Sequence, residues 1–186
     1  MIMAIASTAS LLLSSVLIII YLTTPIYILR GDANGYIGFT GYYLEAFGER
    51  LRSPVLDSLR IYTAPIYISS SVALITSALS IAKYIRRRGF SIHMLAMLQG
   101  SAGILVISIG ILAALSQIVE RVLSVVASSY SHESSAGRII YGGTDVYEAI
   151  PWILRLLISQ LPYASLLMLT AILLIYSFKK ETAVKI

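Results

Sequence analysis

The sequence contains no cysteine and little charge. Without cysteine, the chain has no disulfide bonds, no thiol catalysis and no thiolate ligands for zinc or iron–sulfur clusters. Charged residues make up 12% of its 186 residues, against about 25% in soluble globular domains. Asparagine occurs once and glutamine three times, a scarcity of thermolabile residues that is typical of thermophile proteins.

Recognisable catalytic motifs are also lacking. The chain has no HExxH motif, no phosphate-binding loop and no recognisable Ser/His/Asp arrangement. Its two histidines, His93 and His132, fall near opposite sides of the predicted membrane, so no bis-histidine haem is expected. The adjacent pair His132 and Glu133 offers fewer ligands than a stable metal site needs. The sequence therefore predicts no enzyme, no cofactor and no metal site.

Four long apolar stretches fill most of the chain. Three of them, residues 1–29, 61–82 and 89–119, contain no Lys, Arg, Asp or Glu, and the fourth, residues 149–178, contains only Arg155. About 20 apolar residues in a helix cross the hydrocarbon of a bilayer. We expect an all-α integral membrane protein, a bundle of four transmembrane helices in a single membrane domain over residues 1–186. The expected spans cover approximately residues 3–28, 62–84, 91–119 and 151–178, and the two long loops cover residues 30–61 and 120–150.

The positions of the basic residues predict the topology. Arg86, Arg87 and Arg88 stand between spans two and three with no acid beside them, and Lys179 and Lys180 follow span four. Cytoplasmic loops carry the excess of Lys and Arg in membrane proteins. We therefore expect a multi-pass protein of the cell membrane with both termini in the cytoplasm and both long loops facing outward. The net charge of +5 then reflects topology, and no nucleic-acid partner is expected.

A row of small residues follows span three at spacings of four and three residues. Its members are Ala96, Gly100, Gly103, Ile107, Gly110 and Ala114. Lipid is as apolar as leucine, so helices in a bilayer associate by close backbone approach instead of burial from water. We interpret this row as a helix-packing seam, and Ser101 and Ser108 project away from it. Packing inside the bundle is the preferred interpretation; a contact between subunits and a pore lining are the alternatives.

Spans one and two carry rows with many hydroxyl groups. Span two has Ser69, Ala73, Thr76 and Ser80, and span one has Ser7, Ser10 and Ser14. Such side chains commonly bond to their own helix backbone, so these rows need not line a water path. We expect them to pack in a tight bundle with span three at its centre.

Proline and glycine mark the expected helix ends and loops. Ser53 and Pro54 predict the N-cap and first turn of a short helix through Ile61. Pro162 allows two interpretations of span four: one helix that begins near Pro151 and kinks, which we prefer, or an interfacial segment before a short crossing. Residues 35–43 are interrupted by glycine, and no strand is predicted there.

Arg155 is the single charge within a span. It stands about one helical turn from the expected outer boundary, with Trp152 three residues before it. A long basic side chain at that depth can reach the headgroups, and tryptophan prefers the same depth. We therefore interpret Trp152 and Arg155 as interface anchors.

The order and charge of the loops are similar to those of claudin-like tetraspan proteins: a longer outer loop, a short basic turn, a second outer loop and a basic tail. The resemblance covers the whole chain but only its topology. The paired cysteines and the Trp motif of the first claudin loop are absent, and the only tryptophan is Trp152.

These features predict a structural or accessory membrane protein. The 13 tyrosines are frequent in the expected loops and span ends, and Tyr-rich surfaces suit protein contacts. The expected partners are the lipid bilayer and either further copies of the chain or other membrane subunits, in a homo-oligomer or larger complex. The alternative is a small oligomeric channel or transporter. No Asp or Glu lies inside a span, which argues against proton-coupled export of the small multidrug transporter kind.

The topology gives a first testable prediction. Neutral residues in place of Arg86, Arg87 and Arg88 remove most of the positive-inside signal, so they should weaken or scramble the orientation. A reporter fused after Ile186 should be cytoplasmic in the unmodified protein. A reporter found outside the cytoplasm would show that either the number of spans or their predicted orientation is wrong.

Overall fold

The computed structural model describes residues 2–31, 33–46, 49–87, 89–128, 131–133, 139–141 and 144–184. Side chains are described for residues 2–31, 33–45, 49–86, 89–123 and 145–177. The chain forms two compact units. The helix unit comprises Met1–Ile18, Ile68–Ile109 and Leu156–Ile186, and the sheet unit comprises Ile19–Tyr67 and Gly110–Arg155. The expectation of one membrane domain stays a prediction.

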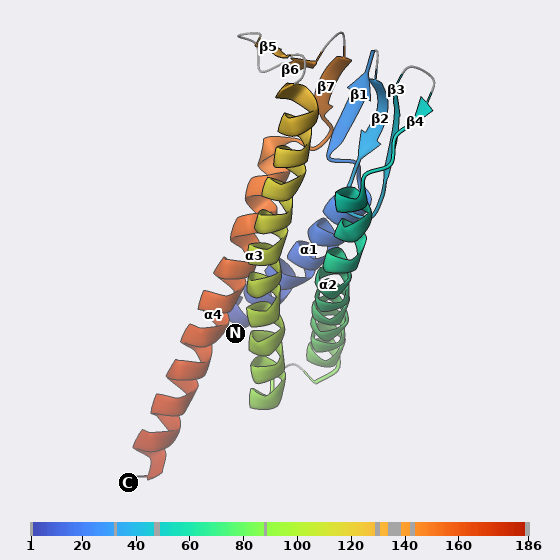
Figure 1. Cartoon of the computed structure of the whole chain (residues 1–186). Coiled ribbons are helices and arrows are strands. Elements are labelled where there is room, and N and C mark those ends of the chain that lie inside the picture. Colours follow the sequence, from blue (N-terminus) through green and yellow to red (C-terminus); the bar gives the residue numbers. More distant parts are fainter. Residues whose placement is uncertain are drawn as a thin grey trace. The chain divides into compact units, whose positions relative to one another are not determined.

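Four helices follow one another along the chain (Figure 1): α1 (Ile2–Thr23), α2 (Pro54–Arg87), α3 (Ile92–Ser128) and α4 (Trp152–Val184). All four are long and apolar enough to cross a membrane, as the charge-free stretches predicted. Three of them extend beyond the expected spans, because α2 starts at Pro54, α3 continues to Ser128 and α4 ends at Val184.

Ser53 caps α2, as predicted. The Leu56 amide lies 3.4 Å from the Ser53 hydroxyl oxygen, and the Asp57 amide donates to the Ser53 carbonyl at 2.9 Å. The predicted short helix, however, does not end at Ile61; it is the first part of α2, which continues through Pro65. Helix α4 likewise runs from Trp152 through Pro162 without a break, as the preferred interpretation of one helix predicted. Whether its first turns lie at the membrane interface stays a prediction.

The two long loops form one antiparallel sheet, and in this respect the all-α expectation is wrong. Its strands lie in the order β4–β3–β2–β1–β7–β6–β5. The first loop supplies β1 (Tyr27–Arg30), β2 (Ala33–Ile37), β3 (Tyr42–Ala46) and β4 (Glu49–Arg50). The second supplies β5 (Ser131–Glu133), β6 (Ile139–Tyr141) and β7 (Thr144–Glu148). These strands are two to five residues long, too short for a clear alternating pattern in the sequence.

Gly35 explains why a glycine-rich segment is a strand here. Its φ of 142° is one that other residues rarely adopt. A Cβ at this position would lie 1.9 Å from the Tyr43 carbonyl oxygen on β3. Glycine therefore permits the close approach of β2 and β3.

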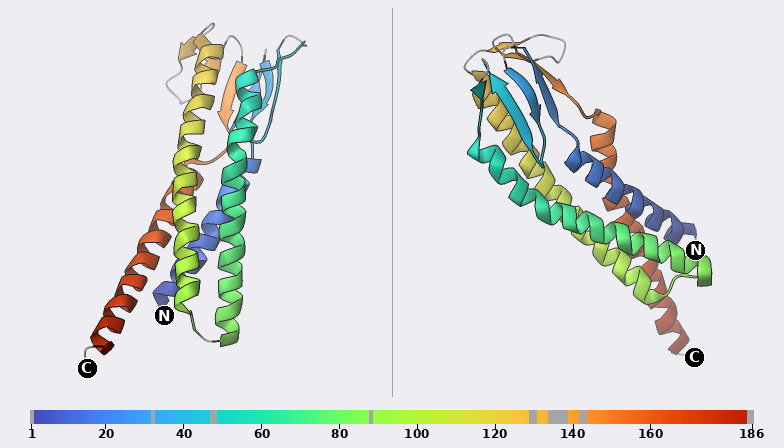
Figure 2. Two further views of the ribbon diagram at one scale, coloured as in Figure 1. Left: turned by 60° about the horizontal axis from the view of Figure 1, so that its bottom comes forward. Right: turned by 90° about the vertical axis from the view of Figure 1, so that its right-hand side faces the viewer.

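The sheet unit has a core between the sheet and the adjoining helix ends. Ile37 and Phe39 are 1% exposed, and the Phe39 ring lies 5.5 Å from that of Tyr21 between centroids. The helix ends contribute further buried side chains: Leu22, Leu56, Leu59 and Val119. The strands run alongside the ends of α2 and α3 within this unit (Figure 2).

In the helix unit, the buried positions of α3 are mostly large and those of α2 are mostly small. The buried positions of α3 recur at three and four residues: Leu95, Leu98, Ala102, Leu105 and Ile109. The matching positions of α2 are mostly small: Ser70, Ala73, Ser77 and Ser80. This spacing is the coiled-coil pattern of closely packed helices. The hydroxyls of Ser69 and Ser108 lie 2.7 Å apart, and those of Thr76 and Ser101 lie 3.1 Å apart, so α2 and α3 are in direct contact.

Most of the buried hydroxyls have partners. Thr8, Ser15 and Ser77 each donate to the carbonyl four residues earlier, at 2.6–2.8 Å, the backbone bonding that the sequence suggested. Other polar contacts join further helix pairs. The Ser10 hydroxyl of α1 donates to the Leu161 carbonyl of α4 at 3.3 Å, and Gln99 of α3 donates to Thr170 of α4 at 3.0 Å.

The small-residue row of α3 points away from this packing. Ala96, Gly100, Gly110 and Ala114 are exposed, and Ile107 is 66% exposed. A Cβ added at Gly100, Gly103 or Gly110 would meet nothing within 4 Å. The row therefore does not pack inside the chain's own bundle, contrary to the preferred interpretation. Ser101 and Ser108 do project away from the row, as expected, but they point into the bundle, where they are 6% and 5% exposed.

This packing predicts the effect of small-to-large changes on α3. Ser101→Leu and Ser108→Leu insert bulk against α2, and overpacking of this kind typically costs about 1–3 kcal/mol. Gly103→Leu and Gly110→Leu meet open space in the chain, so they should leave the unfolding temperature of the monomer in detergent unchanged or higher. Earlier unfolding of the glycine variants than of the serine variants would contradict this packing. If the glycine variants lose an oligomer while their monomers stay stable, the row lies between subunits.

Candidate interaction surface on the sheet

The sheet has one buried and one exposed face. Successive side chains of a strand point to opposite faces, and the register fixes which residues share each face. Tyr27, Leu29 and Ile37 point to the core and are at most 8% exposed. The opposite face, which we call the tyrosine face, is formed by Ile28, Arg30, Asn34, Tyr36, Tyr43, Glu45, Arg50, Asp145 and Tyr147.

Three tyrosines of this face lie in one row across the strands. Tyr43 on β3 pairs with Tyr36 on β2, Tyr36 pairs with Ile28 on β1, and Ile28 pairs with Tyr147 on β7. The three tyrosines are 38–43% exposed. Side chains at paired positions lie about 4.5–5.5 Å apart at Cβ, so the three tyrosines and Ile28 form one continuous row across the sheet.

Carboxylates orient two of these rings. The Tyr43 hydroxyl donates to Glu45, and the Tyr147 hydroxyl donates to Asp145 at 3.2 Å. Each partner stands two residues away on the same strand, so each ring must lean along its strand to reach it. The Glu45 hydrogen bond also raises the pKa of Tyr43. The Arg50 guanidinium lies 5.6 Å from the centre of the Tyr43 ring, within the range of a cation–π contact.

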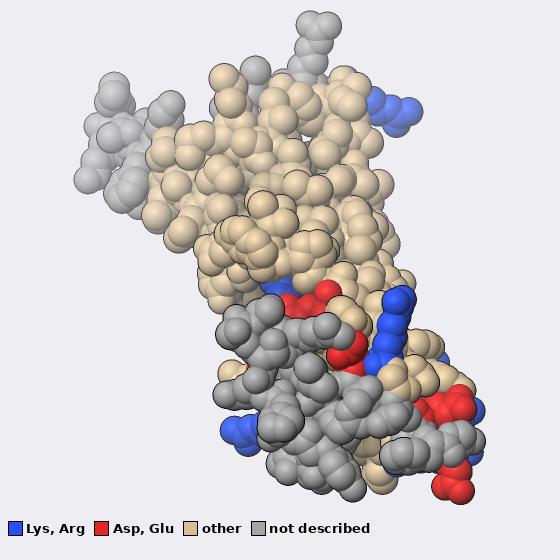
Figure 3. Space-filling view, turned by 90° about the horizontal axis from the view of Figure 1, so that it is seen from above, with Lys and Arg blue, Asp and Glu red and all other residues tan. Residues whose placement is uncertain are grey.

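A second row on the tyrosine face carries charge of both signs. Arg50 on β4 pairs with Glu45 on β3, and Glu45 pairs with Asn34 on β2. Arg30 on β1 follows, and it pairs with Asp145 on β7. Asn34 also closes the turn between β1 and β2, because its amide group bonds both the N–H and the carbonyl of Gly31 at 3.1 and 2.9 Å. Figure 3, a view onto the sheet end, shows acidic and basic side chains interspersed there.

The core face carries a polar cluster near the start of α4. Arg155 forms an ion pair with Glu148 of β7, with 3.3 Å between Nη2 and Oε2, and its Nη1 donates to Oε1 at 3.5 Å. Burial raises the pKa of Tyr27 from 10.0 to about 12. The negative charges of Glu120 and Glu148 raise this pKa further, and the positive charge of Arg155 lowers it, each by a smaller amount than burial. Arg155 thus joins the first turn of α4 to β7; its predicted role as an interface anchor stays a prediction. Trp152, the other predicted anchor, is 72% exposed at the first position of α4.

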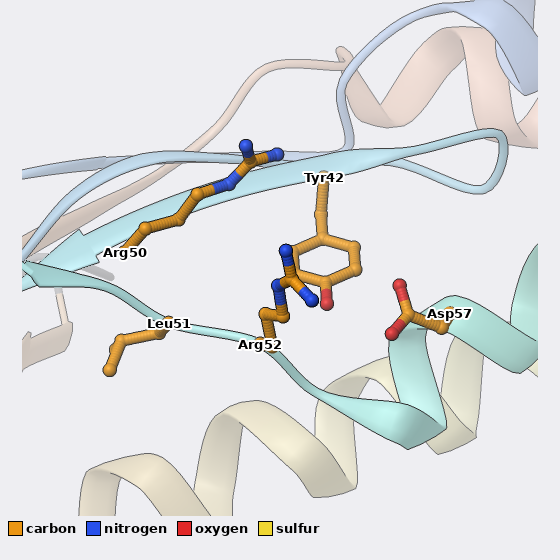
Figure 4. A pocket seen from close by; sticks show the side chains of 5 residues that line it. All are labelled: Tyr42, Arg50, Leu51, Arg52 and Asp57. Atoms are coloured by element: carbon orange, nitrogen blue, oxygen red, sulfur yellow. The ribbon is translucent and has the colours of Figure 1, made fainter.

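A pocket of about 260 Å³ lies where the chain passes from β4 to α2. Arg52 and Asp57 point toward Tyr42 from its two sides (Figure 4). The Tyr42 hydroxyl is already engaged, because it accepts from the Ser53 amide at 2.7 Å and donates to the Ser53 carbonyl at 3.3 Å. These bonds hold the segment before α2 against β3.

The remaining predicted residues are only partly described. Arg86 is exposed near the end of α2. Arg88 and the side chains of Arg87, Lys179 and Lys180 lie outside the described residues, so their role as topology determinants stays a prediction. Across the described part of the chain, no group of three or more His, Asp or Glu side chains could hold a metal ion. The sequence contained the tyrosine face only as scattered tyrosines; the register between strands brings them together.

The raised pKa of Tyr27 predicts a dependence of stability on pH. An unfolded chain ionises this phenol near pH 10 and the folded chain near pH 12, so stability falls as pH rises between these values and is unaffected by this group below pH 10. Tyr27→Phe should remove a phenol that titrates near pH 12 in the folded protein, as measured by phenolate absorbance. It should also reduce the loss of stability between pH 10 and pH 12. Tyr62→Phe, at an exposed position of α2, is the control. If the absorbance change that disappears in Tyr27→Phe is one that occurs near pH 10, the result would contradict the burial of this phenol.

Comparison with known proteins does not assign this arrangement to a family. No protein-family model matches the chain, and no curated protein matches it in sequence. The function therefore has to be argued from the two exposed features themselves, the tyrosine face and the small-residue row of α3.

Proposed function

We propose that the chain is a structural or accessory tetraspan protein of the cell membrane, without catalytic activity, that acts through protein contacts in a homo-oligomer or a larger membrane complex. The observation that carries this proposal is the row of three exposed tyrosines in register across the sheet. Tyrosine supplies large contact area at a small cost in conformational entropy and is enriched at the centres of protein interfaces.

Two further features support the proposal. The small-residue row of α3 leaves a helix face open to close approach by another helix. The basic clusters favour cytoplasmic termini, and this orientation puts the sheet outside the membrane, where its charged and aromatic face meets water and other proteins.

The alternative, a small oligomeric channel or transporter, relies on Ser69, Thr76, Ser80 and Gln117 as pore-lining residues. The hydroxyls of Ser69 and Thr76 already contact Ser108 and Ser101 of the same chain. A helix-to-helix contact is a sufficient role for them, and it supports the accessory function over the alternative.

Purification from the native membrane in gentle detergent tests the proposal. The chain should elute as an assembly, identified by mass spectrometry as further copies or other membrane subunits. Alanine at Tyr36, Tyr43 and Tyr147 together should lower the assembled fraction about tenfold or more, because central aromatic residues dominate the energy of such contacts. Tyr62→Ala, which removes a tyrosine that is 57% exposed on α2, should leave the assembly intact.

Reconstitution in liposomes separates the two functions. The accessory function predicts no selective solute flux from the purified protein. Selective flux from the purified chain, abolished by changes at Ser69 and Thr76, would establish the alternative and overturn the proposal.

A further inference from the structure

The charged row of the tyrosine face has an order that complements itself. Across β4, β3, β2, β1 and β7 the row reads Arg50, Glu45, Asn34, Arg30 and Asp145, which is positive, negative, neutral, positive and negative. Read backwards, every charge changes sign around the central Asn34. A second copy turned by 180° about an axis along β2 therefore sets Glu45 opposite the partner copy's Arg30, and Arg50 opposite its Asp145.

Among axes that run along one of these five strands, only the β2 axis sets no charged residue against its own copy. An axis along β1 sets Arg30 against the same arginine of the second copy, and an axis along β3 does so for Glu45. Like charges directly opposite each other are unfavourable across such an interface. The β2 axis also sets apolar and aromatic side chains of the two copies against each other: Tyr36 faces Tyr36 of the second copy, and Tyr43 faces its Ile28.

The direction of the axis suits a membrane protein. Two-fold symmetry is the commonest arrangement of homo-oligomers, and two copies in the same bilayer can be related only by an axis along the membrane normal. The strands run alongside the ends of α2 and α3 within the sheet unit (Figures 1 and 2). An axis along β2 thus lies close to the direction of these helix ends. We infer that the tyrosine face pairs with the tyrosine face of a second copy in the same membrane, with Tyr36 on the two-fold axis.

This inference rests on the proposed function and names the partner at the sheet. Five strands about 4.8 Å apart and about 15 Å long give a face of roughly 350–400 Å². That is about half of the 800 Å² or so that each partner buries in a stable soluble complex. The contact therefore depends on confinement of both copies to one bilayer, and the test belongs in membranes.

The absence of native cysteine allows a clean cross-linking test. In membranes, Tyr36→Cys treated with a short bismaleimide should give a covalent dimer, because face-to-face sheets lie about 10 Å apart and position 36 meets its own copy. Leu51→Cys is the matched control: both native side chains are 43% exposed, but Leu51 lies off the axis beyond β4. The expected yield at position 36 is about tenfold higher. Equal yields at the two positions would overturn the inference.

Charge reversal tests the pairing itself. Arg30→Glu and Glu45→Arg, each introduced into the Tyr36→Cys chain, place like charges opposite each other and should lower its dimer yield about tenfold. When the two variants are co-expressed, each faces an opposite charge at both pairs, so cross-linking between differently tagged copies should return. Glu49→Arg makes the same charge change as Glu45→Arg at a position whose strand pairing points it away from this face, and it should have no effect.

The outcomes separate this inference from the proposed function. No return of cross-linking in the mixed sample overturns the self-pairing. Cross-linking of position 36 to a different membrane subunit that co-elutes with the chain also overturns it, but leaves the proposed function standing. A monomer in native membranes that conducts a solute overturns both.

Discussion

The pairing of β1 with β7 is the constraint on which the sheet unit depends. It joins Tyr27–Arg30 of the first loop to Asp145–Glu148 of the second, and a further bond from the Ala149 amide to the Ile26 carbonyl extends it at 2.9 Å. Without it, each loop would be a small separate sheet with an exposed edge, which is marginally stable and prone to aggregation. Because α1 ends at Thr23 and α4 begins at Trp152, the pairing also fixes where these two helices leave the sheet.

The exposed and buried faces of the sheet both follow from this pairing. It sets Tyr147 beside Ile28 and so continues the aromatic row that starts at Tyr43 and Tyr36. On the other face it brings Glu148 to the position where Arg155 can bind it, close to the buried phenol of Tyr27. An ion pair that is 30% and 57% exposed contributes little to stability by itself; it joins the first turn of α4 to β7 within the sheet unit.

The sequence predicted the features that depend on local composition and missed those that depend on long-range pairing. Absence of charge identified the four helices, and Ser53 identified a helix start. The sheet could not be predicted from the sequence, because its strands are short and a glycine such as Gly35 normally argues against a strand. Only the close contact between Gly35 and the Tyr43 backbone on the next strand explains why glycine stands there. On α3 the leucine positions and the small-residue positions share the same spacing of three and four residues. Periodicity gives the angle between these faces but not which one meets a helix, since lipid and protein interiors are equally apolar.

The outward position of the α3 glycines has an energetic consequence. Glycine within a helix costs about 0.5–1 kcal/mol relative to alanine, and Gly100, Gly103 and Gly110 stand within α3, where a Cβ would meet nothing. The chain's own packing does not offset this cost, because the buried contacts of α3 come from its leucines and serines. Close approach of a helix from a second chain, as proposed, would offset it through dispersion contacts over several turns. The proposed assembly of copies would therefore give the same physical explanation to the open helix face and to the tyrosine face, because each would gain its stabilising contacts from a second chain.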